Sequence, residues 1–270
     1  MSPSRRGSSS TRCSVGADWL LVVGAGVLGL CFGSFLNVCI LRLPHDQSLL
    51  RPPSTCPQCK RRIAWRDNIP VVSWLLLKGK CRHCHKPISR QYPLIEGLVG
   101  LLWASSVLWF GPTLHALAGA LLGTILIGIA ITDARHYLIP DEFTWGGLVL
   151  GLALSLGGGV PGFLQAVLGA ATGLALLYAV AVVGKWVFKE EAMGGGDIKM
   201  MAMVGSFVGW KGVLLTIFAG ALLGTVIFVP LSFKKKKLVP FGVFLAVGAA
   251  VTFLFRDTVI DWYLRFIRGG

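Results

Sequence analysis

The sequence predicts an all-α polytopic membrane protein, with about eight transmembrane helices and a small cytoplasmic zinc-binding domain between the first and second of them. Apolar residues make up 54% of the 270-residue chain and charged residues 14%, whereas soluble proteins are roughly 25% charged. The apolar residues are gathered in runs near the length that spans a bilayer. Two CxxC pairs lie in the longest polar segment, 42–91. The composition excludes a soluble enzyme and a disordered chain.

Eight apolar runs are bounded by charged residues, proline or glycine clusters, as spanning helices are. They cover residues 19–41, 94–110, 114–132, 143–156, 163–188, 198–209, 213–233 and 238–255. The fourth and sixth runs are short, so each is expected to be tilted, interrupted or only partly embedded. Residues 1–18 and 256–270 are expected to be N-terminal and C-terminal tails.

The basic residues set the expected orientation, because lysine and arginine stay on the cytoplasmic side of a membrane. With the N-terminus outside, the segments that face the cytoplasm hold 19 of the 26 basic residues. Segment 42–91 alone holds 11 of them, which suits contact with anionic lipid headgroups. We therefore expect this segment to form a cytoplasmic domain against the membrane lipid.

Four cysteines in segment 42–91 have the spacing of a structural metal site. They are Cys56, Cys59, Cys81 and Cys84, two CxxC pairs separated by 21 residues. Four thiolates on two tight turns close a tetrahedral zinc site and leave no position for a catalytic water. The metal would supply much of the folding free energy of so small a domain. Two local disulfides and unligated thiols are the alternatives, and a reducing cytoplasm disfavours the first.

Two further patterns suggest nucleotides or nucleic acids. Residues 24–29 match the G-x-G-x-x-G dinucleotide fingerprint, but they lie inside an apolar run rather than between a strand and a helix. Glycines in a span more often let helices pack closely. Trp65 and Trp74 stand among basic residues, as in nucleic-acid surfaces. Neighbouring lipid accounts for that charge, so no nucleic-acid partner is expected.

Two aspartates are candidates for a catalytic pair. Asp133 ends the third run and Asp197 opens the sixth, so both lie at the same inner-leaflet depth, where acids are costly and usually functional. Two carboxyl groups in a partly dry cleft share one proton, so that one activates a water while the other protonates a peptide carbonyl. An N-cap role for Asp197 and a solvated helix end for Asp133 are the alternatives. The residues alone leave both interpretations open.

Other acids compete with this pair. Asp141 and Glu142 follow Pro140 and suit an N-cap and first-turn role in the next span. Glu96, near the inner end of the second run, is either a third functional acid or a side chain that reaches the headgroups.

From about residue 31 onward, the sequence resembles the bifunctional type IV prepilin leader peptidases. The similar segments are FGSFLNVCILRLP at 32–44, CPQCKRRIAWRDNIPVVSWLLLKGKCRHCHKPISRQYPLIE at 56–96, ITDARHYLIPD at 131–141 and MGGGDIKM at 193–200. In this resemblance Asp133 matches the first catalytic aspartate, and Asp197 that of the G-x-G-D motif shared with presenilin-type proteases. The residues expected to support the catalytic loop are Gly194, Gly195, Gly196 and Lys199. The three glycines are expected to let another backbone segment approach Asp197.

The resemblance implies an enzyme of the bacterial inner membrane. Such enzymes cut the basic leader from prepilins or pseudopilins after a glycine, at the cytoplasmic face. It also implies that the zinc domain, 42–91, takes part in methylating the new N-terminus with S-adenosylmethionine, and that 94–255 is the peptidase core. Two other functions stay open, a zinc-bearing membrane scaffold and a proton-coupled transporter. A transporter is expected to carry its acids nearer the bilayer midplane.

Overall fold

The computed structural model describes residues 15–49, 51, 53–189, 193–232 and 240–267. The long helices are α1 (Val15–Arg42), α3 (Gln91–Phe110), α4 (Leu114–His136), α5 (Asp141–Ser155), α6 (Gly159–Phe188), α7 (Gly195–Ser232) and α8 (Phe241–Ile267). Shorter helical turns are η1 (Leu43–His45), η2 (Trp65–Asp67), α2 (Val72–Leu76) and η3 (Leu156–Gly158). In this part of the chain, extended pairing is limited to the isolated bridges Thr55–Arg62 and Lys80–Pro87. The all-α prediction is confirmed.

Each predicted run falls on a helical segment of its own. Runs 198–209 and 213–233 correspond to the two helices that make up α7, which meet at the non-helical backbone of Gly209 (φ 69°, ψ 174°). Phe233, Leu238 and Val239, at the edges of the last two runs, lie outside the described residues. Five described segments are long and apolar enough to cross a membrane. They are Trp19–His45, Gln91–Phe110, Leu114–His136, Asp141–Val187 and Gly195–Ile227, with Phe241–Phe255 as a shorter apolar helix. The chain is a multi-pass membrane protein, and a count of eight spans stays a prediction.

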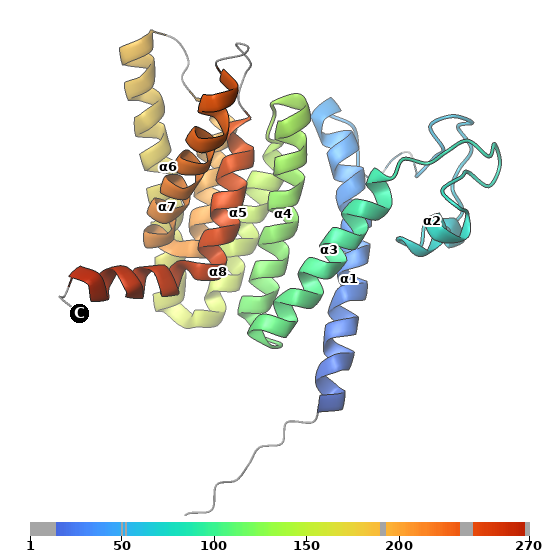
Figure 1. Ribbon diagram of the computed structural model, residues 1–270, viewed down its shortest axis with the longest axis horizontal. Helices are drawn as coiled ribbons and strands as arrows, with labels where there is room; N and C mark the ends of the chain where they lie inside the picture. The colour runs from blue at the N-terminus through green and yellow to red at the C-terminus, as the bar shows by residue number, and fades with distance from the viewer. Residues whose placement is uncertain (1–14, 50, 52, 190–192, 233–239, 268–270) are drawn as a thin grey trace, which may run out of the picture.

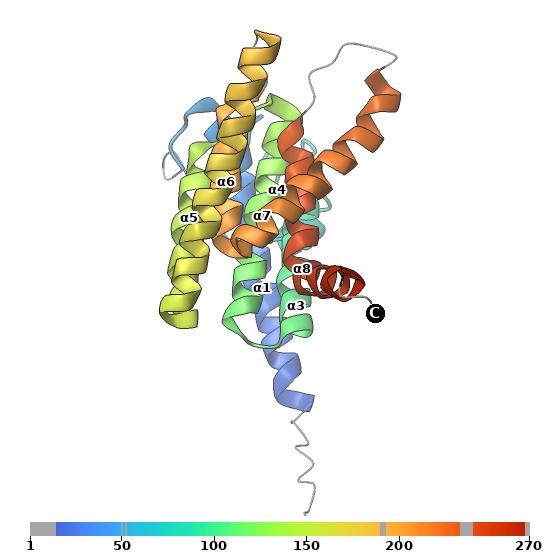
Figure 2. The ribbon, with the colours of Figure 1, turned by 90° about the vertical axis from the view of Figure 1, so that its left-hand side faces the viewer.

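The helices form one bundle, with the segment between α1 and α3 projecting from its side (Figure 1). α1 and α3 pack together on one flank of α4, while α5 to α8 lie on the other flank, as Figure 2 also shows. Successive helices alternate in direction, and the two helices of α7 run in opposite directions, so α1 and α4 end where α5, α7 and α8 begin, at the upper end in Figure 1. The last turns of α8 continue past the predicted span end at 255 and turn away from the bundle, where a tail was expected.

Glycines set the closest helix contacts, as small residues do in membranes. A Cβ atom at Gly29 would lie 2.8 Å from Cβ of Trp103, so α1 and α3 can approach only because this position has no side chain. The backbones of α6 and α7 meet at Gly169 and Gly205 for the same reason. Gly29, the last glycine of the dinucleotide-like pattern, therefore serves helix packing.

Candidate functional site

Asp133 lies in the last turns of α4 and is held from the side by α8. Its side chain is only 6% exposed. The backbone N–H of Val243 donates a hydrogen bond to Asp133 Oδ2 at 3.2 Å. Gly242 permits this contact, because a Cβ atom there would lie 2.9 Å from the same oxygen. Asp133 is therefore not a solvated helix end.

Asp197 lies in the first turn of α7, two residues after the helix begins at Gly195. Its position is thus past the N-cap, which argues against the capping alternative. The Oδ1 atom of Asp197 is buried and has no hydrogen-bond partner among the described residues. Gly196, directly before Asp197, and Gly242, which lies against the Asp133 carboxyl group, both pack against Ile139. A buried carboxylate oxygen without a donor needs a water, a shared proton or a substrate group.

The side chain of Ile139 connects the surroundings of the two acids. Ile139, in the connection between α4 and α5, is 8% exposed. A Cβ atom at Gly242 would lie 2.9 Å from its Cδ1, and a Cβ atom at Gly196 would lie 2.9 Å from its Cβ. The starts of α7 and α8 and the end of α4 therefore converge on one apolar side chain. This arrangement places both acids in a partly dry cluster at one end of the bundle.

The three glycines before Asp197 differ in what surrounds them. Only Gly196 is closely packed, against Ile139. A Cβ atom at Gly195 would meet nothing within 4 Å, and one at Gly194 would meet only Oδ2 of Asp197, at 3.5 Å. Among the described residues, what approaches these glycines is the side chain of Ile139, and the approach of another backbone segment stays a prediction.

Lys199 and Asp141 form an ion pair beside this cluster. Lys199 Nζ donates to both carboxylate oxygens of Asp141, at 2.8 and 2.7 Å, and so joins the first turn of α7 to that of α5. The side chains are 39% and 56% exposed. Asp141 is the first residue of α5 rather than its N-cap, which is Pro140. Glu142, in the same first turn, is exposed. The charge of Asp141 is thus already balanced.

The sulfur atoms of the four predicted ligands come together. Those of Cys56, Cys59, Cys81 and Cys84 all lie within 4.8 Å of one another, with 3.9 Å between Cys56 and Cys84. Tetrahedral zinc with Zn–S bonds of about 2.3 Å places its sulfurs about 3.8 Å apart. The cysteines that the structure describes form no disulfide. The cluster therefore fits a metal ion such as zinc and not the two local disulfides.

The two CxxC turns have the same backbone geometry. The N–H of Lys60 donates to Cys56 O at 2.9 Å, and the N–H of His85 donates to Cys81 O at 3.0 Å. Lys60 and His85 both adopt a positive φ, of 58° and 55°. Hydrogen bonding from the backbone of Cys59 lowers the pKa of the Cys56 thiol. A thiol that ionises readily is prepared to bind a cation.

One ion pair ties the second CxxC turn to the rest of this domain. Arg82 donates from Nε and Nη2 to both oxygens of Asp67 in η2, at distances from 2.6 to 3.1 Å. The hydrogen bonds from Arg82 hold the pKa of the Asp67 carboxyl below its usual range. The bidentate geometry fixes the relative orientation of the two segments.

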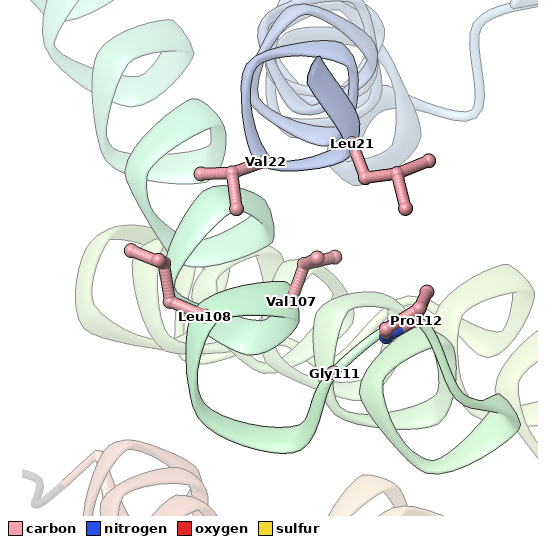
Figure 3. A pocket seen from close by; sticks show the side chains of 6 residues that line it. All are labelled: Leu21, Val22, Val107, Leu108, Gly111 and Pro112. Carbon is pink, nitrogen blue, oxygen red and sulfur yellow. The ribbon is translucent and has the colours of Figure 1, made fainter. Parts of the chain in front are cut away.

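A pocket between α1 and α3 lies away from both clusters. It has a volume of about 240 Å³ and is lined by Leu21, Val22, Val107, Leu108, Gly111 and Pro112, as Figure 3 shows. These residues belong to the start of α1 and the end of α3, opposite the end of the bundle where Asp133 lies. Because the lining offers no titratable side chain, this pocket is not a candidate for hydrolysis.

Sequence reasoning missed Val243, Gly242 and Ile139, which surround the two aspartates. Ile139 directly precedes Pro140, and Gly242 and Val243 follow Pro240; each proline stands directly before a helix. That position at the predicted inner end of a span was the available signal. Nothing in the sequence showed that these helix starts would converge on Asp133.

Comparison with known proteins gives two family matches. The model of the type IV leader peptidase family matches residues 120–229, and that of the bacterial peptidase A24 N-terminal domain matches residues 27–110. No solved structure matches the chain.

Several curated proteins are similar over most of the chain, and each carries the name prepilin leader peptidase/N-methyltransferase. One from Aeromonas hydrophila is 34% identical, over 92% of this chain and 96% of its own length. One from Xanthomonas campestris pv. campestris is 36% identical, over 90% and 94%. One from Myxococcus xanthus is 41% identical, over 77% of this chain and 62% of its own length.

Proposed function

Because the chain belongs to the type IV leader peptidase family, we propose that it is an inner-membrane aspartyl endopeptidase that removes the leader peptide of type IV prepilins or pseudopilins. The cut follows a glycine at the cytoplasmic face. The observation that carries this proposal is the buried, unpartnered Oδ1 of Asp197, whose surroundings are joined through Ile139 to those of the Asp133 carboxyl group. Two adjacent acids with one free acceptor suit the activation of a water next to a peptide carbonyl.

In the proposed mechanism, the two carboxyl groups share one proton. The ionised one takes a proton from the attacking water, and the protonated one donates to the carbonyl oxygen of the scissile bond. The N–H of Val243 keeps the Asp133 carboxyl oriented toward this task, since it donates to Oδ2. A bell-shaped pH dependence of the cleavage rate is expected, because the pair loses function when it holds two protons or none.

The location of the acids supports an orientation for the whole chain. The upper end of the bundle in Figure 1 carries both aspartates and adjoins segment 42–91, which holds 11 basic residues. We place this end in the cytoplasm, since basic segments stay there. The apolar segment of the substrate would then remain in the bilayer, while its basic leader reaches the aspartates from the cytoplasmic side.

Methylation of the new N-terminus is the second proposed activity, with S-adenosylmethionine as methyl donor. The relatives' shared name supports it. The cysteine cluster, with its sulfurs within 4.8 Å of one another, would hold a structural zinc ion that fixes the fold of the domain.

A membrane assay tests the proposed activity directly. The purified protein in lipid vesicles, given a full-length prepilin with its basic leader, is expected to shorten it by the leader. A proton-coupled transporter or a membrane scaffold would leave the prepilin intact. Mass spectrometry of the product also locates the cut, and cleavage elsewhere than after glycine would contradict the proposed specificity.

The ion pair between Lys199 and Asp141 is expected to matter little for catalysis. Both side chains are substantially exposed, and exposed pairs contribute about 0 to 1 kcal/mol. Asp141→Asn should therefore keep cleavage within about fivefold of wild type. Initial rates on the same prepilin measure this. An inactive Asp141→Asn protein would indicate that Asp141, and not Asp133, is the first catalytic acid.

Two alanine substitutions test whether the close packing of Gly196, and not simply the glycine content of the loop, positions Asp197. Gly196→Ala should lower cleavage by roughly tenfold or more, because its Cβ would lie 2.9 Å from Ile139 and shift the start of α7. Gly195→Ala is the matched control and should be near wild type, since nothing lies within 4 Å of its Cβ position. Equal rates for the two variants would show that contact with Ile139 does not position Asp197.

A further inference from the structure

A second buried acid lies where the N-terminal helices meet the metal domain. Glu96 of α3 is 7% exposed. Its Oε2 accepts a hydrogen bond of 2.7 Å from the backbone N–H of Val71. A Cβ atom at Gly33 would lie 2.7 Å from Cα of Glu96, so α1 closes directly over the acid. The proposed peptidase mechanism does not use Glu96.

One helical turn after Gly33 on α1, the side chain of Asn37 has an oxygen atom that receives no hydrogen bond from the described residues. Asn37 is 1% exposed. Its Nδ2 donates to the backbone oxygens of Tyr92 and Gly33, at 3.1 and 3.3 Å. Because both partners are carbonyl oxygens, the amide orientation is fixed, and Oδ1 is left buried without a partner among the described residues. Tyr92 and Glu96 are four residues apart on α3, so these groups line one side of the same interface.

The chemistry of this interface selects a cationic hydrogen-bond donor. The Glu96 carboxylate and Asn37 Oδ1 are both acceptors, and a buried acceptor needs an N–H or O–H group. A sulfonium centre has the charge but no N–H. A primary ammonium group has both. We infer that the Glu96–Asn37 cluster binds the N-terminal amine exposed by leader cleavage and takes its proton before methylation; this inference rests on the proposed function.

The backbone at Val71 shows how an amine would reach Glu96. Val71 adopts φ 60° and ψ −49°, a conformation that is unfavourable for a β-branched residue. Its N–H now supplies the donor that the carboxylate requires. An incoming ammonium N–H can replace it, and the Val71 segment can then return to an ordinary conformation.

The proton and methyl transfers balance with these residues alone and a sulfonium methyl donor. The Glu96 carboxylate accepts one proton from the bound ammonium, which leaves a neutral amine with a free electron pair. That pair forms the new N–C bond to the methyl carbon as the C–S bond breaks. The products are a methylammonium group on the substrate and a neutral thioether.

The cluster is also linked to the peptidase aspartates. Arg135 of α4, two residues after Asp133, donates from Nη1 to Gln91 Oε1 at 2.8 Å. Gln91 begins α3, directly before Tyr92. This hydrogen bond joins the end of α4, which carries Asp133, to the start of α3, which carries Tyr92 and Glu96.

Glu96→Gln tests the inference, because glutamine keeps an acceptor for Val71 but cannot take a proton. The variant should methylate a pre-cleaved prepilin peptide at least about 100-fold more slowly than wild type, while cleavage of intact prepilin stays within about threefold. Asn37→Leu, which removes the unpaired acceptor, should likewise slow methylation and leave cleavage unchanged. Glu142→Gln is the control for losing an acid and should keep both rates.

A binding measurement tests the inference without relying on the rate of methylation. Wild type should bind the pre-cleaved peptide with a free N-terminus more tightly than the same peptide N-acetylated, and Glu96→Gln should lose this preference. A retained preference, or methylation within about threefold of wild type, would overturn the inference. Parallel loss of cleavage and methylation in both cluster variants would also overturn it and make the cluster structural. If wild type methylates the pre-cleaved peptide but never cleaves intact prepilin, the proposed peptidase function fails instead.

Discussion

Replacing either Asp133 or Asp197 by asparagine is expected to abolish leader cleavage, with a loss of about 10³-fold or more. Asparagine keeps the size of the side chain but can neither take nor give the shared proton. The surrounding contacts should persist, since an amide oxygen can still accept the hydrogen bond that Asp133 Oδ2 receives from Val243. The loss is therefore chemical and not a consequence of unfolding.

Initial rates of prepilin shortening in lipid vesicles measure this loss for each variant. Asp141→Asn is the matched control, because it makes the same change at an exposed acid that is already ion-paired. Membrane insertion and methylation of a pre-cleaved peptide should be unchanged in both inactive variants. Normal cleavage by either Asp133→Asn or Asp197→Asn would refute the catalytic pair.

Cys81→Ser is expected to unfold the domain between α1 and α3. Removing one of four thiolates destroys a closed tetrahedral site, and metal binding in comparable small domains supplies about 10 to 16 kcal/mol of folding free energy. This domain has little else to stabilise it, because the described part of 42–91 contains only short helical turns and two isolated bridges. Methylation should be lost with it, because the Val71 segment that covers Glu96 belongs to this domain.

Zinc content and limited trypsin digestion measure this effect. Wild type should hold about one zinc ion per chain and resist cleavage between the CxxC pairs, whereas Cys81→Ser should hold none and be cut rapidly there. Cys31→Ser provides the control, because Cys31 is exposed on α1 and outside the cluster. Full protease resistance of Cys81→Ser would show that metal does not maintain the domain.

The helices were predictable because apolar runs in a membrane have few alternative structures. The positions at which the helices begin and end were less predictable. Runs 198–209 and 213–233 correspond to the two helices of α7, but the break between them falls at Gly209, inside the end of the first run, rather than in the interval 210–212. The end of α8 extends past 255 because charged residues there ended the apolar run without ending the helix. Hydropathy reports where a chain can lie in lipid, while backbone hydrogen bonds decide where a helix stops.

The site was predictable only in part. Asp133 and Asp197 could be paired because alternating spans place both at one end of the bundle. The contacts of Val243 and Ile139 with the site could not be predicted. They depend on which helices pack side by side, and the order of the spans does not determine this. Asn37 was missed for the same reason, since its unpaired oxygen exists only in the packed interface with α3.

The most direct test of the central claim is whether positions 133 and 197 meet in the membrane-embedded protein. Mild oxidation of an Asp133→Cys and Asp197→Cys double variant should join the two peptides by a disulfide that mass spectrometry detects and reductant removes. Asp133→Cys paired with Gly158→Cys, in η3 at the opposite end of the bundle, should give no such product. Cross-linking of the 133–197 pair is the predicted result. Its absence, with the variant protein folded and its zinc bound, would contradict a shared catalytic site.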